Sequence, residues 1–254
     1  MCDVSNSAST PPLSRRLLSE FLGTALLVAV VVGSGIAAET LSPGDVGLQL
    51  LENSTATVFG LTVLILWFGP ISGAHFNPVV SIADWFLGRR SGAGITLPDV
   101  GAYAIAQIAG GIAGAVLANV MFEVDQGMSA KDRLGSGHMV GEIVATAGLV
   151  ALIFALVRTG RGAFAAPAVG AYIGAAYWFT SSTSFANPAV TLGRMFTDTF
   201  AGIAPGSAPA FIGMQIIGAL VGIALTLALY PDLSKNAGAT DDDTPSGAVI
   251  PHPH

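Results

Sequence analysis

The chain has 254 residues, of which 52% are hydrophobic and only 10% are charged, whereas soluble domains carry about 25%, so an ordinary water-soluble protein is excluded. The formal net charge is -6, and no basic stripe predicts nucleic-acid binding. Cys2 is the only cysteine, which excludes an intrachain disulfide and a cysteine cluster for a metal. We therefore expect one membrane domain without a metal or another cofactor.

Long apolar segments follow one another along nearly the whole chain, and about 20 apolar residues suffice to cross a bilayer as a helix. In chain order we expect spanning helices at 17–38 and 49–69, a half-helix at 78–87, spanning helices at 99–122, 139–157 and 163–182, a half-helix at 188–196 and a last spanning helix at 208–230. The two short segments cannot span, yet they are too apolar for plain loops, which predicts re-entrant half-helices. The fold class is therefore an all-α membrane protein with six transmembrane helices and two re-entrant half-helices.

The basic residues predict the orientation of these helices. One side of a six-span arrangement receives Arg15, Arg16, Arg89, Arg90, Arg158, Arg161 and Lys235, and the other receives Lys131, Arg133 and Arg194. Because positively charged loops stay in the cytoplasm, both termini are expected there, in a multi-pass protein of the plasma membrane in contact with lipid. We expect a cytoplasmic segment at 1–14, a membrane domain at 15–230 and a disordered acidic cytoplasmic tail at 231–254.

The two halves of the membrane domain, about 15–122 and 138–230, resemble each other. A glutamate stands near the start of the first span of each half, as Glu20 and Glu142, and an Asn-Pro pair follows the second span of each. Three spans per half give the two copies opposite topology. Inverted repeats of this kind place the functional site near the midplane, at their interface.

The Asn-Pro pairs predict how the half-helices begin. Asparagine suits the N-cap, and proline suits the first helical position, so Asn77-Pro78 and Asn187-Pro188 should each start a short helix. If both helices dip inward from opposite faces, their positive ends meet at mid-membrane and the two amides donate hydrogen bonds into a pore. An isolated Asn-Pro is usually an ordinary helix cap, but two copies in matching places favour a pore constriction.

Several motifs together resemble the aquaporin, or major intrinsic protein, family over about residues 15 to 230. They are Glu20-Phe21-Leu22-Gly23-Thr24, Ser72-Gly73-Ala74-His75-Phe76-Asn77-Pro78, Tyr103, Ala106-Gln107, Gly110-Gly111 and Asn187-Pro188-Ala189. The resemblance implies an aquaporin-like fold, a homotetramer with a pore in each subunit, and passive flow of water or a small uncharged solute. It also implies a constriction formed by Asn77, Pro78, Val79, Asn187, Pro188 and Ala189.

Departures from the family pattern concern the filter. Val79 replaces the usual alanine, a conservative change, whereas Val190 stands where the family usually has an arginine that narrows the opening and carries a charge. The filter is expected to comprise Phe59 or Thr57, Ala175, Ser184 and Val190, a wide and weakly polar ring. The alternative is that another side chain, such as Arg194 or Trp178, refills the gap.

A filter without arginine resembles that of bacterial family members associated with arsenite movement. Undissociated arsenous acid is a small neutral molecule whose hydroxyl groups compare with those of glycerol. Either of these solutes, or water, is therefore an expected cargo.

The buried acids have two interpretations. Intramembrane carboxylates by default indicate function, so Glu20 and Glu142 could belong to a proton-coupled transporter. The family resemblance instead implies that they brace the re-entrant loops, as His75 also should. An enzyme is disfavoured, because the spans contain no metal-ligand set and no serine with a plausible histidine base.

Overall fold

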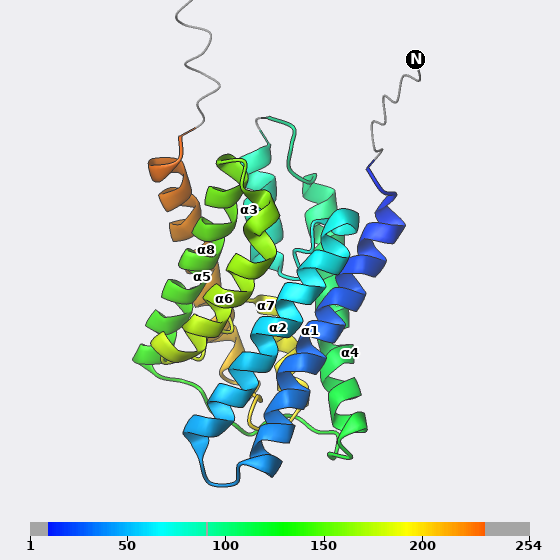
Figure 1. The fold of residues 1–254 in the computed structure, drawn as a ribbon, viewed down its shortest axis with the longest axis vertical. Coiled ribbons are helices and arrows are strands. Elements are labelled where there is room, and N and C mark those ends of the chain that lie inside the picture. The colour runs from blue at the N-terminus through cyan, green and yellow to red at the C-terminus, as the bar shows by residue number, and fades with distance from the viewer. Residues whose placement is uncertain (1–9, 90, 232–254) are drawn as a thin grey trace, which may run out of the picture.

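The computed structural model describes residues 10–89 and 91–231, and in these ranges every regular element is a helix. The elements are α1 (Leu13–Leu41), α2 (Val46–Ser72), α3 (Pro78–Gly88), α4 (Leu97–Met121), α5 (Ser136–Arg158), η1 (Gly162–Phe164), α6 (Ala165–Phe179), α7 (Pro188–Gly193), η2 (Arg194–Phe196) and α8 (Ala208–Leu229). They form one bundle in which α1 begins and α8 ends at the same end, which we call the terminal end (Figure 1). Arg90, residues 1–9 of the expected segment 1–14 and residues 232–254 of the expected tail lie outside the described residues.

Five of the six expected spans are long apolar helices, namely α1, α2, α4, α5 and α8. The sixth segment is shorter than expected, since α6 has only 15 residues and follows the single turn η1. The polar run after Phe179 explains the early end. Thr180 is extended, and the Ser182 hydroxyl accepts a hydrogen bond from the Ser184 amide at 3.2 Å, so side chains compete for backbone groups there.

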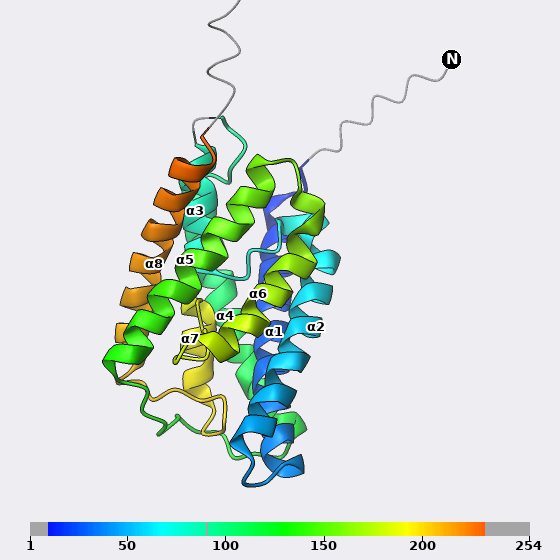
Figure 2. The ribbon, with the colours of Figure 1, turned by 60° about the vertical axis from the view of Figure 1, so that its left-hand side comes forward.

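Both half-helices begin at an asparagine N-cap followed by proline, as the sequence predicts. The Asn77 side chain accepts a hydrogen bond from Val79 N at 3.1 Å, and the Asn187 side chain accepts one from Ala189 N at 2.9 Å. Figure 2 shows α3 near the terminal end and α7 towards the opposite end, which we call the loop end. The two short helices therefore enter the bundle from opposite ends, as an inverted repeat requires.

Glycines bring the long helices of each repeat into close contact. Gly110 and Gly114 of α4 pack on backbone carbonyls of α1, and Gly218 and Gly222 of α8 pack on backbone carbonyls of α5. A Cβ atom at any of these positions would lie within 2.7 Å of a carbonyl oxygen of the neighbouring helix. Small residues of this kind let apolar helices approach closely in lipid, where no hydrophobic force drives them together.

Replacing Gly114 with alanine is therefore expected to destabilise the bundle. The added Cβ would lie 2.1 Å from the carbonyl oxygen of Ala25, which is backbone and can yield only if α1 and α4 separate. Overpacking of this kind costs about 1 to 3 kcal/mol, which should lower the Tm of the detergent-solubilised protein by roughly 5 °C. Gly101→Ala is the matched control on α4, because nothing lies within 4 Å of its Cβ position. Equal Tm values for both variants would contradict this packing argument.

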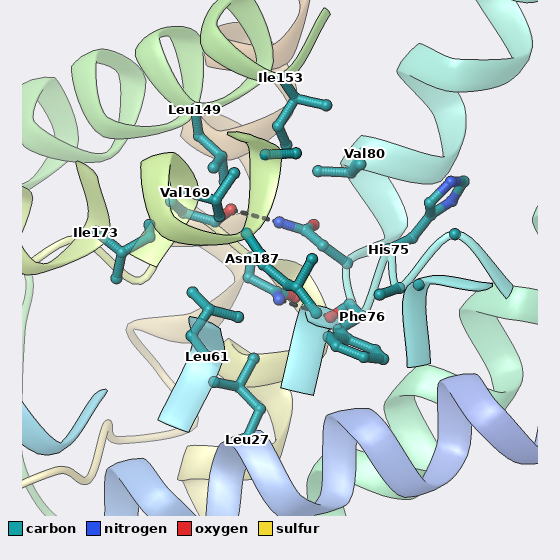
Figure 3. Close-up of a pocket in the computed structure, with 18 of the residues that line it drawn as sticks. Leu27, Leu61, His75, Phe76, Val80, Leu149, Ile153, Val169, Ile173 and Asn187 are labelled. Atoms are coloured by element: carbon teal, nitrogen blue, oxygen red, sulfur yellow. Dashed lines mark hydrogen bonds between the residues drawn. The ribbon is translucent and has the colours of Figure 1, made fainter. Parts of the chain in front are cut away.

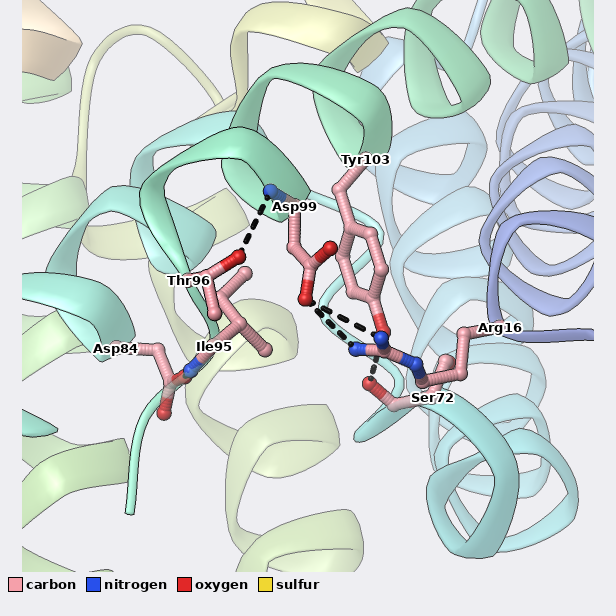
Figure 4. Close-up of polar contacts among 7 residues, drawn as sticks. All are labelled: Arg16, Ser72, Asp84, Ile95, Thr96, Asp99 and Tyr103. Carbon is pink, nitrogen blue, oxygen red and sulfur yellow. Dashed lines mark hydrogen bonds and ion pairs between the residues drawn. The ribbon is translucent and has the colours of Figure 1, made fainter. Parts of the chain in front are cut away.

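Polar contacts at the terminal end join α1, α2 and α4 (Figure 4). Arg16 of α1 pairs with Asp99 of α4 at 3.2 Å, and the Tyr103 hydroxyl donates to the carbonyl of Ser72 at 3.0 Å. Asp84, on α3, accepts a hydrogen bond from Ile95 N at 2.8 Å. These contacts fix the end of α2, from which the loop towards Asn77 departs.

Candidate functional site

The two Asn-Pro turns meet and bond to each other inside the bundle. Asn77 Nδ2 donates to the carbonyl oxygen of Ala186 at 2.8 Å, and Asn187 Nδ2 donates to that of Phe76 at 2.7 Å, as Figure 3 shows for Asn187 and Phe76. A carboxamide nitrogen carries two N–H groups, so each asparagine keeps one donor beyond this reciprocal pair. Both asparagines line a central cavity, where that donor is available.

A fully buried glutamate binds each re-entrant loop. Glu20 accepts hydrogen bonds from His75 N at 3.0 Å and Phe76 N at 2.7 Å. Glu142 accepts hydrogen bonds from two consecutive backbone amides of the second loop, Phe185 N and Ala186 N, each at 2.9 Å. These four amide donors are thus satisfied within the protein, although no regular structure pairs them.

Each glutamate also accepts a hydrogen bond from a glutamine of its own repeat. Gln107 Nε2 donates to Glu20 at 2.7 Å, and Gln215 Nε2 donates to Glu142 at 2.6 Å. A carboxylate that accepts several hydrogen bonds suits the braced geometry, because its lone pairs are occupied and its orientation is fixed.

The loops share an unusual backbone conformation that leaves their carbonyl groups unused. Non-glycine residues with positive φ recur at matching positions, Ala74 (51°) and Phe76 (49°) in the first loop and Ser184 (51°) and Ala186 (49°) in the second. Over the described residues, no protein group donates to the carbonyl oxygens of Gly73, Ala74, His75, Ser184 and Phe185, all of which line the cavity. The loops therefore offer a row of acceptors to a solute, while their donors face the glutamates.

The cavity has a volume of about 550 Å³, and most of the side chains that line it are apolar. The apolar lining includes Leu27, Leu61, Val80, Leu149, Ile153, Val169 and Ile173 (Figure 3). A cavity that combines apolar side chains with a line of hydrogen-bonding groups suits a small hydroxylated molecule, because these groups can replace part of the water bound to the solute. In the view of Figure 3, Leu149 and Ile153 lie above Asn187, and Leu61 and Leu27 lie below it.

Comparison with known proteins identifies the family. A sequence profile described as Major intrinsic protein matches residues 7–184. The chain belongs to the major intrinsic protein family. It is 51% identical over 214 residues to aquaglyceroporin AqpS of Rhizobium meliloti (strain 1021), with 84% of this chain and 89% of the relative covered. It is also 32% identical over 210 residues to aquaporin Z of Brucella melitensis, with 73% of this chain and 86% of the relative covered.

A solved structure shows the same fold. The X-ray structure of the aquaglyceroporin from Plasmodium falciparum matches with a TM-score of 0.61 at 20% identity, covering 90% of this chain and all of that one. Because members of the major intrinsic protein family are channels, this chain is a passive channel for water or small solutes and not an enzyme. Nothing in the comparisons supports the proton-coupled alternative.

In this major intrinsic protein, α2 presents Thr57 to the cavity. Thr57 is buried and lines the cavity, whereas Phe59 is 68% exposed on the outside of the bundle. Two residues along a helix correspond to about 200° of rotation, so the two side chains point in nearly opposite directions. The structure thus corrects the alternative in which Phe59 faces the filter.

The expected position on α6 also needs correction. Ala175 is exposed on the outer face of α6, while Tyr177 and Ile173 line the cavity. The Tyr177 hydroxyl lies 3.3 Å from Thr57 Oγ1, which joins α6 to α2 at this level. The same rotation of about 200° separates Ala175 from Tyr177, and sequence spacing counted from Asn187 placed the filter residue on the wrong face.

The second loop and α7 bring Ser184 and Val190 to the cavity. Of the two side chains considered as replacements for the missing arginine, Trp178 is exposed and donates through Nε1 to Ser54 at 3.2 Å. Arg194, on η2, is buried and lines the cavity. The expected alternative to an open gap therefore involves Arg194 and not Trp178.

His75 and the residues expected to form the constriction lie close to the asparagines in the chain. The His75 ring nitrogen Nδ1 is 3.0 Å from Ser81 Oγ, and the ring packs edge-on against Tyr103 at 5.5 Å, so it links the first loop to α3 and α4. Pro78, Val79, Pro188 and Ala189 are buried in the first turns of the half-helices.

The loop between α4 and α5 brings basic residues to the loop end of the bundle. Arg133 donates to the carbonyl oxygens of Gly202 at 2.7 Å and Phe200 at 3.1 Å. Burial lowers the pKa of Arg133 to about 10, which still leaves the guanidinium charged at neutral pH. Burial also lowers the pKa of Lys131, with a further contribution from the positive charge of Arg133.

Proposed function

We propose that this channel conducts water and small uncharged polyols such as glycerol in both directions, driven by the solute gradient alone. The observation that carries the proposal is the pair of reciprocally bonded amides, Asn77 and Asn187, at the wall of a cavity lined by unused carbonyl groups. A hydroxyl group can accept a hydrogen bond from an asparagine and donate one to a carbonyl. The two half-helices then act as the constriction, with Pro78, Val79, Pro188 and Ala189 shaping it.

Exclusion of cations follows from the same groups. The spare amide hydrogens of Asn77 and Asn187 carry partial positive charge into the cavity, which opposes a cation in a region with little water. The braced loops keep this arrangement rigid, which assigns Glu20, Glu142 and His75 a structural role. A proton relay through Glu20 would compete with the four hydrogen bonds that its carboxylate accepts.

The width of the filter favours solutes larger than water. Val190 offers neither charge nor donor at a position where an arginine would narrow the opening. Relatives named as an aquaglyceroporin and as a glycerol uptake facilitator, the latter from Pseudomonas aeruginosa and 31% identical over 233 residues, support a polyol as cargo. The proposed filter consists of Thr57, Tyr177, Ser184 and Val190, and undissociated arsenous acid, a neutral trihydroxy molecule, fits the same chemistry.

The membrane location, the oligomeric state and the orientation of the channel are inferred from its surface. Large apolar side chains such as Phe59, Val63 and Trp67 are exposed on α2 and do not line the cavity, as contact with lipid or a second subunit requires. We propose a homotetramer in the plasma membrane in which 15–230 forms the channel domain. Arg15 and Arg16 stand in the first turn of α1, and Arg89 and Arg161 follow the ends of α3 and α5 at the same terminal end, which supports a cytoplasmic location for both termini under the positive-inside rule.

Stopped-flow light scattering on proteoliposomes tests the proposal. Vesicles containing the purified protein are expected to swell in glycerol and in arsenous acid at least about fivefold faster than protein-free vesicles. In protein-free vesicles the solute must dissolve in the hydrocarbon of the bilayer, whereas the channel offers it a polar path. The rates should not change when a pH gradient is imposed. Glycerol entry that requires a pH gradient would contradict a passive channel, and water flux without glycerol flux would contradict the wide filter.

A further inference from the structure

One cationic side chain lines the cavity one helical turn beyond Val190. Among the described residues of the cavity wall, Arg194 is the only arginine or lysine. It follows Val190 by four residues, so its Cα lies about 6 Å further from the constriction if the helical rise continues. Helical side chains lean towards the N-terminus of their helix, which directs Arg194 back towards the level of Val190.

One face of the guanidinium and its Nε are held by the protein, whereas its two terminal nitrogens are not. Its central carbon lies 3.4 Å from the centroid of the Phe185 ring, and Nε donates to the carbonyl oxygen of Ala201. Phe185 is itself held by an edge-on contact with Phe211 at 5.1 Å. Over the described residues, the two terminal nitrogens of Arg194 have no protein acceptor, and no carboxylate pairs with them. Their N–H groups are therefore free to bind a solute in the cavity.

Three hydroxyl groups complete this end of the cavity. Thr57 Oγ1 donates its proton to the carbonyl of Asn53 at 2.8 Å, so in the 3.3 Å contact Tyr177 must be the donor and its oxygen stays free to accept. Ser184 Oγ is buried without a hydrogen-bond partner. Together with Arg194 these side chains present donors and acceptors side by side, which matches the vicinal hydroxyl groups of a polyol.

We propose that Arg194 is a specificity-determining residue. From the cavity wall it supplies the positive charge that Val190 does not bring to the proposed filter. Stacked on Phe185, the guanidinium repels cations and donates hydrogen bonds to hydroxyl oxygens, but it does not cross the opening as a side chain at 190 would. The filter is thus wide and positive at once, and its ligand class is small polyols. The inference rests on the proposed function, because it concerns how the same channel selects its solute.

Arg194→Met and Arg194→Lys test the inference in proteoliposomes, with glycerol, water and methylammonium fluxes measured in each preparation. Methionine fills similar space without charge, so methylammonium flux should rise about fivefold and the glycerol-to-water ratio should fall about threefold. Lysine keeps the charge but not the planar fork, so cation exclusion should persist while the ratio still falls. Lys131→Met is the matched control, because it removes a basic charge at the loop end from a residue that does not line the cavity.

The outcomes separate this inference from the proposed function. Wild-type vesicles that conduct no glycerol would contradict the function itself. Wild-type conduction together with unchanged selectivity in Arg194→Met would overturn only the role of Arg194. If Arg194→Met fails to assemble, Arg194→Lys decides, since a wild-type glycerol-to-water ratio there contradicts the role of the fork. An equal effect of Lys131→Met would assign the selectivity to general charge at the loop end and would also overturn the proposal.

Discussion

Replacing Glu142 with leucine is expected to abolish solute flux and to destabilise the protein by about 4 kcal/mol or more. The carboxylate is fully buried and accepts hydrogen bonds from Phe185 N, Ala186 N and Gln215 Nε2. Each donor left unsatisfied costs about 1 to 3 kcal/mol, and lipid offers no water to replace the lost acceptor. The loop that carries Asn187 would then lose its fixed shape. Thermal unfolding in detergent and light scattering in proteoliposomes measure the two effects.

Two further variants decide what the carboxylate does. Glu142→Gln keeps one acceptor oxygen, so a bracing role predicts a smaller loss of stability and measurable glycerol flux, whereas a proton relay predicts that flux stops although the fold survives. Glu39→Gln is the surface control, because this exposed side chain accepts a bond from Phe200 N at the rim of the bundle. If Glu142→Leu changed neither the Tm nor the solute flux, the loop would hold its shape without the carboxylate.

The sequence predicts most of the fold because its signals are local. A run of apolar residues sets the length of a spanning helix, and an asparagine followed by proline sets the start of a half-helix, so neither depends on distant contacts. The segment 163–182 shows the limit of this reasoning. Hydropathy alone extends it to Ser182, whereas the helix ends at Phe179, because hydroxyl groups of the following residues bind backbone groups and the chain must turn towards Asn187.

The residues that line the cavity at the proposed filter could be predicted only in part because a membrane helix is apolar on every side. In a soluble helix a polar face shows which residues point inward, but lipid and protein interior both accept apolar side chains. The choice between Thr57 and Phe59 and the position of Ala175 therefore depend on rotation angles that the sequence does not mark. The place of Arg194 depends on Phe185 and on the carbonyl of Ala201, two contacts that form only in the folded chain.

Replacing Val190 with arginine is expected to reduce glycerol permeability more than about tenfold while water permeability falls less than about threefold. A water molecule is smaller than glycerol and can still pass through the narrowed opening. Val190 is buried and lines the cavity next to Asn187, so the longer side chain can extend only into the passage. The new charge would also lie one turn from Arg194, and their repulsion would hold the added guanidinium away from the wall. Light scattering with glycerol and with an impermeant osmolyte measures both permeabilities.

Val190→Met separates bulk from charge, because methionine is long but neutral and flexible. A filter at this position predicts that methionine lowers glycerol flux less than arginine does. If Val190→Arg lowered water and glycerol equally, the substitution would have blocked or unfolded the channel, and Val190 would have no role in selection. A selective loss in Val190→Arg and a loss of cation exclusion in Arg194→Met would together show that width and charge, which a single arginine combines, are set here by two residues one helical turn apart.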